Sequence, residues 1–304
     1  MNRIINWKAY EDSENIRTGS VELQTSLHER VYAPIFQKKE MAQQWLKSGR
    51  TYWRMKLLNK FEFFINKSIS GRIIEIGAGT GWCSAILSQK RDVNEIYSLD
   101  YDPYCVIQLM PQVHMVLNAD ISKINYVYGS FNKIPLENFF DLVISIGTLH
   151  HSENLNKTLE ECYKILKPGG YLLASEPLEF NYMSQEIEKG KEESFDKNAQ
   201  FKYGKEVKLK ENSDHYYRLC QYEASAYSAG FNVYPYVFSK FLGEEATDEI
   251  FKQRKCYERF QLKIFKPYFA NEAYDRLMLI LEKPKGNKIA SPEEILKYEK
   301  NFFD

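Results

Sequence analysis

Three glycines at alternating positions follow directly after a short apolar stretch, and they constrain this chain more than any other feature. Residues 72–82 are RIIEIGAGTGW, so a predicted strand that contains Glu75 leads into Gly77, Gly79 and Gly81. Glycine has no Cβ atom, so the backbone can adopt positive φ here and approach a bound molecule closely. The amide groups at the start of the next helix point toward the same place. The segment therefore predicts a strand, loop and helix that bind a nucleoside-containing cofactor.

The spacing of these glycines differs from the dinucleotide fingerprint GxGxxG. Counted from Gly77, the third glycine of that fingerprint would stand at position 82, which is Trp82 here. A tryptophan cannot provide the close helix approach that the last glycine allows. Glu75 is expected near the crevice at the carboxyl end of the strand, where a carboxylate attracts a cationic ligand and repels a pyrophosphate. The loop therefore disfavours NAD.

A second acid follows at the distance expected for a ribose contact. Residues 94–103 are NEIYSLDYDP and predict a short strand that ends in Asp100. An acid about twenty residues after the glycine loop accepts hydrogen bonds from the ribose diol in dinucleotide folds, and Asp100 is placed to do the same. Asp102 precedes Pro103, so we expect Asp102 to cap the helix that begins there.

Three more strands are predicted at intervals that suit alternating strands and helices. Residues 124–128 and the apolar run 140–146 predict a third and a fourth strand, the fourth buried on both faces. Residues 155–166 show helical spacing, and KPGG at 167–170 ends that helix. A fifth strand is expected at 171–175. The order predicts a parallel α/β sheet.

The segments match a known family in sequence and in order. EIGAGTG at 75–81 resembles motif I of the class I S-adenosylmethionine-dependent methyltransferases, and the stretches at 140–151 and 161–177 resemble later parts of that family, in particular a type 11-like small-molecule subgroup. The resemblance covers 71–283. It implies a Rossmann-like doubly wound sheet of seven strands, in which the last strand, 276–282, is antiparallel and lies between its neighbours.

The resemblance also implies a cofactor and its contacts. The methyl donor is expected to be S-adenosylmethionine, its product S-adenosylhomocysteine, and no metal is expected. The family often has an acid where Ser130 stands, but a serine can still exchange one hydrogen bond with adenine. Phe131 either stacks on adenine or is a plain core aromatic. The residues expected at the cofactor are Glu75, Gly77, Ala78, Gly79, Gly81, Trp82, Asp100, Tyr101, Gly129, Ser130, Phe131, Ser145 and Ile146.

Three segments lie outside this domain and are expected to govern the choice of substrate. Residues 1–70 predict a mainly helical cap, and 284–304 a helical tail. The insertion at about 178–215 is rich in charge, and we interpret it either as a lid or as a solvated loop. Candidate substrate contacts, each with simple packing or surface exposure as the alternative, are Tyr10, Tyr52, Trp53, Glu176, His215, Tyr216 and Arg218.

Two adjacent histidines follow the fourth strand and are the candidate catalytic groups. His150 and His151 stand where a general base would have to lie, and an imidazole with an ordinary pKa of about 6.5 can deprotonate a hydroxyl or an amine at neutral pH. The alternative is that one imidazole caps the next helix or forms part of the pocket wall. The sequence does not favour one histidine over the other.

Composition excludes little. The 41 basic and 41 acidic residues cancel, so the totals indicate neither a nucleic acid nor a membrane as partner. The five cysteines are odd in number and contain no CxxC pair, which disfavours a disulfide framework or a zinc site and favours a reducing compartment. No apolar stretch approaches the length of a membrane span. We expect a cytoplasmic protein with a small-molecule substrate, and the sequence also allows a homodimer.

The function expected from the sequence is methyl transfer from S-adenosylmethionine to a small molecule, such as a secondary metabolite or a surface-glycan precursor. O-methylation is favoured over N- or C-methylation because histidines suit the deprotonation of a hydroxyl. Two other classes of function stay open. One is an aminopropyltransferase-like enzyme, although SIGTLHH after the fourth strand lacks the extra acids that a polyamine site needs. The other is a non-catalytic module that binds the cofactor.

Overall fold

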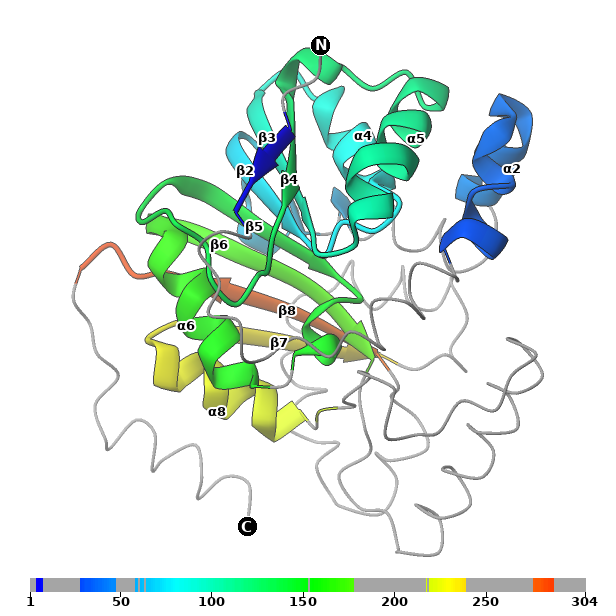
Figure 1. The fold of residues 1–304 in the computed structure, drawn as a ribbon. Coiled ribbons are helices and arrows are strands. Elements are labelled where there is room, and N and C mark those ends of the chain that lie inside the picture. Colours follow the sequence, from blue (N-terminus) through cyan, green and yellow to red (C-terminus); the bar gives the residue numbers. More distant parts are fainter. Residues whose placement is uncertain are drawn as a thin grey trace, which may run out of the picture.

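A single mixed sheet with helices on both faces forms the centre of the molecule in the computed structural model (Figure 1). None of the helices that the structure describes combines the length and apolar character needed to cross a membrane. The described parts of the chain are residues 4–7, 28–47, 58–59, 61–62, 64–152, 154–177, 217, 219–238 and 276–286.

The sheet has eight strands in the order β1-β4-β3-β2-β5-β6-β8-β7. All pairings from β1 to β6 are parallel, and β8 pairs antiparallel with both β6 and β7. The strands are β1 (Ile4–Asn6), β2 (Gly71–Ile76), β3 (Val93–Asp100), β4 (Ile124–Tyr128), β5 (Phe140–Ile146), β6 (Leu166–Pro177), β7 (Asn232–Phe238) and β8 (Arg276–Glu282).

Seven of these strands confirm the predicted doubly wound sheet, including the antiparallel β8 between β6 and β7. The eighth strand, β1, adds one strand to the seven expected from the sequence. It pairs parallel with the edge strand β4 through the register Ile4 to Tyr126. Three residues are too few to produce a hydrophobic period, so the strand depends on the open edge of β4 for its hydrogen bonds.

The fifth predicted strand begins earlier than its sequence indicates. β6 starts at Leu166, which pairs with Phe140, and the register then shifts before Tyr171 pairs with Leu142. The KPGG sequence therefore forms an irregularity within the strand. Glycine and proline in a strand favour such a local departure from the ladder.

Helices lie on both faces of the sheet, with α4 and α5 on one face and α6 and α8 on the other (Figure 1). On the first face α2 also packs against α5. The side chain of Asn154 caps α6 by accepting from the Lys157 amide at 3.1 Å. The helices are α2 (Lys39–Lys47), α4 (Trp82–Ser88), α5 (Met110–Val116), α6 (Leu155–Ile165) and α8 (Leu219–Ala229). Shorter helical turns are η2 (His28–Tyr32), η3 (Ile35–Gln37), η4 (Cys105–Leu109), η5 (Ile121–Lys123) and η6 (Leu149–His151).

Successive residues of the central strands enter two separate hydrophobic clusters, one on each face of the sheet. Ile73 belongs to the cluster under α4 and α5, whereas Ile74 belongs to the cluster under α6 and α8. Side chains of a strand point alternately to the two faces, so both faces of β2 must be apolar. Phe36 and Phe61 from the N-terminal segment join the first cluster. The candidate site described below lies at the carboxyl ends of β2, β3, β4 and β5.

Trp7 tests whether β1 is a structural part of the sheet. The Trp7 amide donates to the carbonyl of Tyr128 at 2.8 Å, and the indole stacks on Tyr97 with 5.9 Å between ring centroids. We expect Trp7→Ala to lower the free energy of unfolding by about 3–5 kcal/mol, because it removes a buried aromatic ring. Chemical denaturation measures the loss. Ile4→Ala on the same strand, where the side chain is 52% exposed, should change stability by about 0.5 kcal/mol or less. Equal effects of the two changes would contradict this role for Trp7.

Candidate cofactor and catalytic site

The three loop glycines have different surroundings. All have positive φ, at 60° for Gly77, 54° for Gly79 and 73° for Gly81. A Cβ atom on Gly77 would lie 2.2 Å from Thr148, and one on Gly81 would lie 2.6 Å from His114. At Gly79 the nearest atom is 3.7 Å away, on His28. Packing therefore requires glycine at the outer two positions, whereas a Cβ atom on Gly79 would make only an ordinary van der Waals contact with His28, so its positive φ is what favours glycine there.

Asp100 ends β3 and binds the glycine loop directly. Its Oδ2 accepts from the Gly79 amide at 2.7 Å, and its Oδ1 accepts from the Asp102 amide at 2.8 Å. Burial raises the pKa of Asp100, while these backbone hydrogen bonds and the nearby His28 act to lower it. The carboxylate is half-buried, so it can meet both the loop and a ligand beside it.

Glu75 points toward the start of α4. Its Oε2 accepts from the Ser84 amide at 2.9 Å and also from the Ser84 hydroxyl, which in turn receives a hydrogen bond from Ser98 at 2.6 Å. The carboxyl is only 4% exposed. Burial raises the pKa of Glu75 to about 7, against the lowering effect of the hydrogen bonds from Ser84. In this arrangement Glu75 fixes the orientation of α4 relative to β2.

His114 packs against the glycine loop at Gly81. It was not among the site residues predicted from the sequence. Burial lowers the pKa of His114 to about 4, so its imidazole is neutral at neutral pH. Nε2 lies 2.8 Å from the carbonyl of Gly81, and Nδ1 lies 2.9 Å from the hydroxyl of Tyr126. A carbonyl can only accept, so Nε2 donates to Gly81 and Nδ1 accepts from the tyrosine. No sequence motif marks this contact.

The residues expected around adenine lie after β3 and β4. Tyr101 and Tyr128 have ring centroids 6.1 Å apart, and Ser130 accepts from the Asn132 amide at 3.1 Å. Phe131 is half-buried and packs against the cluster under α6 and α8, as its core alternative predicts. Gly129 faces Trp7, since a Cβ atom there would lie 2.9 Å from the Trp7 side chain. This edge of the site is therefore formed partly by the residue that follows β1.

Trp82, Ala78 and Ile146 occupy apolar surroundings. Trp82 is the first residue of α4, is 6% exposed, and shares its cluster with Ala78. The Ala78 amide donates to the carbonyl of Leu99 at 2.9 Å, which holds the loop after β2 against β3. Ile146 is half-buried at the end of β5 and packs against the same cluster.

Glu176 and His150 form a buried pair at the carboxyl end of the sheet. The Nδ1 atom of His150 lies 2.8 Å from Oε2 of Glu176, whose side chain is fully buried. Oε1 of Glu176 accepts from the amides of Thr148 and Leu149 and from the Ser145 hydroxyl, each at 3.0 Å. Burial alone raises the pKa of Glu176, but the hydrogen bond and charge of His150 and the backbone amides hold it below its usual value.

This network fixes the turn η6 that contains both histidines. The hydroxyl of Thr148 donates to the carbonyl of Gly77 at 3.3 Å, which joins η6 to the cofactor loop. The His151 amide donates to the Thr148 carbonyl at 2.9 Å, and the rings of His150 and His151 have centroids 4.1 Å apart. Glu176, expected to contact substrate, here contacts His150 and the backbone of the turn.

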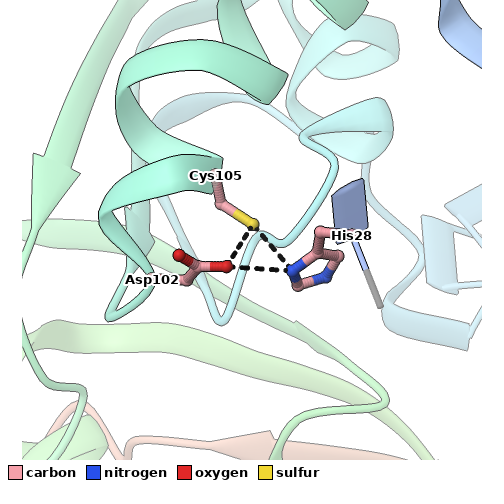
Figure 2. Close-up of side chains that lie close together, drawn as sticks. All are labelled: His28, Asp102 and Cys105. Carbon is pink, nitrogen blue, oxygen red and sulfur yellow. Dashed lines mark hydrogen bonds and ion pairs between the residues drawn. The ribbon is translucent and has the colours of Figure 1, made fainter. Parts of the chain in front are cut away.

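A second cluster consists of His28, Asp102 and Cys105 (Figure 2), and His28 is the nearest neighbour on the Cβ side of Gly79. His28 Nδ1 is 3.1 Å from Oδ2 of Asp102 and 3.0 Å from the sulfur of Cys105, and that sulfur is 3.4 Å from the same Oδ2. Asp102 also caps the following helix, as predicted, because its Oδ1 accepts from the Tyr104 amide at 2.9 Å. Burial and the charges of Asp100 and Asp102 raise the pKa of the Cys105 thiol.

Several predicted positions lie outside the described residues. They include the whole charged insertion at about 178–215, the tail after residue 286, and six of the substrate candidates, namely Tyr10, Tyr52, Trp53, His215, Tyr216 and Arg218.

Comparison with known proteins identifies the domain that these strands build. Residues 74–174 match the family model of the methyltransferase domain, from β2 to β6. This matched part of the chain is similar to the methyltransferase domains of class I enzymes that use S-adenosylmethionine. In the structure the glycine loop follows β2 and Asp100 ends β3, so both lie where the sequence places them in the fold.

Relatives of this methyltransferase domain share limited parts of the chain. Over 112 residues it is 30% identical to malonyl-acyl-carrier protein O-methyltransferase from Priestia megaterium, which covers 37% of this chain and 38% of that protein. Over 117 residues it is 34% identical to squalestatin hexaketide synthase from a Phoma species, covering 34% of this chain and 4% of that protein. The chain therefore spans well under half the length of these curated relatives.

A solved structure extends the likeness over more of the methyltransferase fold. Phosphoethanolamine N-methyltransferase 2 from Haemonchus contortus, solved in complex with S-adenosylmethionine, has a TM-score of 0.56 and 16% sequence identity. The match covers 86% of this chain and 60% of that chain. At this identity the comparison concerns the fold alone.

The buried Glu75 predicts a pH dependence of stability. Its pKa of about 7 in the folded chain exceeds its ordinary value of 4.5, so the folded state holds the proton more tightly. The resulting stabilisation is complete below about pH 4.5 and is lost as the pH rises through 7. Glu75→Gln does not titrate. We expect wild-type stability, measured relative to this variant, to fall by about 2–3 kcal/mol between pH 5 and pH 8.

The comparison requires chemical denaturation of both proteins at each pH, so that the remaining titrating groups cancel. His114→Gln is a control for which the pH dependence of stability has the opposite sign, because the pKa of His114 is lowered to about 4. Its stabilising contribution is present above about pH 6.5 and is lost as the pH falls through 4. A difference between wild type and Glu75→Gln that stays constant with pH would show that Glu75 is not an elevated acid.

Proposed function

We propose that this chain binds S-adenosylmethionine at the glycine loop and transfers its methyl group to a small molecule. The main support for the proposal is the hydrogen bond of 2.7 Å from the Gly79 amide to Oδ2 of Asp100. This hydrogen bond lies within the residues that match the methyltransferase domain. It places the amide of a loop glycine, whose Cβ side is not crowded, next to a half-buried carboxylate. A nucleoside with a ribose diol fits such a pair of features.

Asp100 has the hydrogen-bonding capacity that a ribose needs. Each carboxylate oxygen has two lone pairs, and the backbone amides of Gly79 and Asp102 each use one of them. The two amides also fix the orientation of the carboxylate, so little side-chain freedom is lost when a diol binds. Tyr101 and the half-buried Ser130 and Phe131 are the groups we assign to the adenine side.

His150 is the group we propose as the general base. The pKa of Glu176 is lowered, so this carboxylate is ionised and can only accept a hydrogen bond. Nδ1 of His150, 2.8 Å away, must then be the donor, which leaves Nε2 as the basic nitrogen in the neutral ring. S-adenosylmethionine supplies an activated methyl group when it is bound. The task left to the protein is to orient the acceptor, exclude water and take up the acceptor's proton at Nε2.

A hydroxyl oxygen is the acceptor that this arrangement favours. A hydroxyl loses a proton during methylation and gains from a base, whereas a carboxylate arrives already ionised and gains little. The name of the Priestia megaterium relative specifies O-methylation of a malonyl group, whose free acceptor oxygen belongs to a carboxylate, so that name supports an oxygen acceptor in general and not a hydroxyl in particular. The name of the Phoma relative specifies synthesis of a hexaketide. We therefore propose O-methylation of a hydroxyl on a small metabolite, with a secondary metabolite or a surface-glycan precursor as the class of substrate.

Asp100→Asn tests the cofactor site independently of the acceptor. The asparagine places an amide nitrogen where an oxygen now accepts a hydrogen bond, so one backbone donor is left unpaired. We expect its dissociation constant for S-adenosylhomocysteine to rise at least about tenfold, corresponding to about 1.4 kcal/mol. Titration calorimetry measures the affinity, and Asp120→Asn, at an exposed acid in the cap of η5, is the control. Unchanged affinity in Asp100→Asn would remove Asp100 from the site.

His150→Ala tests the base and the type of acceptor. With a hydroxyl substrate we expect kcat to fall by about 10²–10⁴, the usual range for removal of a general base, while affinity for S-adenosylhomocysteine is retained. His151→Ala should cost less, because the hydrogen bond to Glu176 that fixes the ring belongs to His150. A panel of hydroxyl, amine and carboxylate acceptors, with methyl transfer measured by mass spectrometry, makes the comparison.

The same panel separates the alternatives. If turnover survives both His150→Ala and His151→Ala, a histidine base is excluded. If only carboxylate acceptors are methylated, the acceptor is a carboxylate and not a hydroxyl. Transfer of an aminopropyl group from the decarboxylated cofactor would support an aminopropyltransferase. Tight binding of S-adenosylhomocysteine with no turnover of any acceptor would support a non-catalytic binding module.

A further inference from the structure

The cluster of His28, Asp102 and Cys105 has no part in the proposed methyl transfer, and its geometry suits a metal ion. One potential ligand atom from each residue, Nδ1, Oδ2 and Sγ, points toward a common centre (Figure 2). Asp102 and Cys105 are buried, and His28 is half-buried. These side chains come from two distant parts of the chain, η2 and the turn that begins the helix after β3.

The separations between the three atoms are close to those of a tetrahedral site. They are 3.1 Å between Nδ1 and Oδ2, 3.0 Å between Nδ1 and sulfur, and 3.4 Å between sulfur and Oδ2. Tetrahedral zinc with its usual bond lengths requires about 3.3–3.6 Å between such ligand atoms. The side chains would therefore have to separate by only about half an ångström to admit the ion.

The donor set and its charge select the kind of ion. Thiolate and imidazole are ligands of zinc and similar borderline metals, whereas magnesium and calcium prefer oxygen ligands alone. A thiolate, a carboxylate and a neutral imidazole together have two negative charges, which a divalent ion neutralises inside a buried site.

We propose that His28, Asp102 and Cys105 form a site for a divalent borderline metal ion, with Zn²⁺ as the best match. Nδ1 of His28, Oδ2 of Asp102 and the Cys105 thiolate are the three protein ligands, and water takes the fourth position. The ion replaces the proton on the thiol, which passes to solvent, while the neutral imidazole of His28 holds its one ring proton on Nε2 so that Nδ1 binds the ion. It joins the N-terminal segment to the turn beside the cofactor loop, where His28 is also the nearest neighbour on the Cβ side of Gly79.

Cobalt titration of the metal-stripped full-length chain tests the site without any assay of methyl transfer. Co²⁺ bound to a thiolate in a tetrahedral site gives a sulfur-to-cobalt charge-transfer band and intense visible bands. We expect these bands to saturate at one equivalent and to disappear when Zn²⁺ is added, because zinc binds such sites more tightly than cobalt. Absence of the charge-transfer band in the wild-type chain would overturn the proposal.

Matched cysteine variants locate the ion. Cys105→Ser should lose the charge-transfer band and weaken Zn²⁺ binding at least about a hundredfold, measured by competition with a chromophoric chelator. Cys162→Ser, at another buried free cysteine in α6, should keep both. A band that survives in Cys105→Ser would place the metal elsewhere and overturn the assignment.

A third variant covers the case in which Cys105→Ser fails to fold. His28→Ala changes a half-buried residue of the N-terminal segment and should keep a folded circular dichroism spectrum. We expect it to weaken Zn²⁺ binding at least about tenfold. Unchanged zinc affinity in a folded His28→Ala variant would contradict the site.

Discussion

The contact between Thr148 and Gly77 joins the two halves of the site, and the rest of the arrangement depends on it. A side chain on Gly77 would meet Thr148 at 2.2 Å, and the Thr148 hydroxyl donates to the Gly77 carbonyl at 3.3 Å. The loop after β2 and the turn after β5 are therefore packed as one unit. In the proposed function these two segments hold the methyl donor and the base, so the contact sets the distance between them.

Buried acids at the carboxyl ends of the strands hold this unit together, and each is satisfied in a different way. Glu75 is bonded to Ser84 and fixes α4, whereas Asp100 accepts from two backbone amides and keeps lone pairs for a ligand. Glu176 accepts from two amides of the turn and from the Ser145 hydroxyl at the end of β5, and it interacts with His150. Since a buried carboxylate without partners is very costly, these hydrogen bonds largely determine where each loop can lie.

Most of the sheet could be predicted because its signals are local. The bounds of β4 and β5 agree with the apolar runs at 124–128 and 140–146, and the antiparallel β8 followed from the family resemblance. β1 could not be predicted, because its three residues form a strand only against the edge of β4. His114 and Cys105 were also missed as members of clusters, since their partners lie 33 and 77 residues away and no spacing rule connects them.

The sequence by itself determined the fold class and the chemical family, because the glycine loop, the acid after β3 and the strand order are written in short continuous segments. It also placed Asp100 beside the loop and both histidines after β5. Only the tertiary structure decided which histidine is held by a buried carboxylate, that Glu75 faces Ser84, and that His28 meets Asp102 and Cys105. The physical reason is that side-chain pairing across strands and helices depends on packing in three dimensions, which local propensity does not encode.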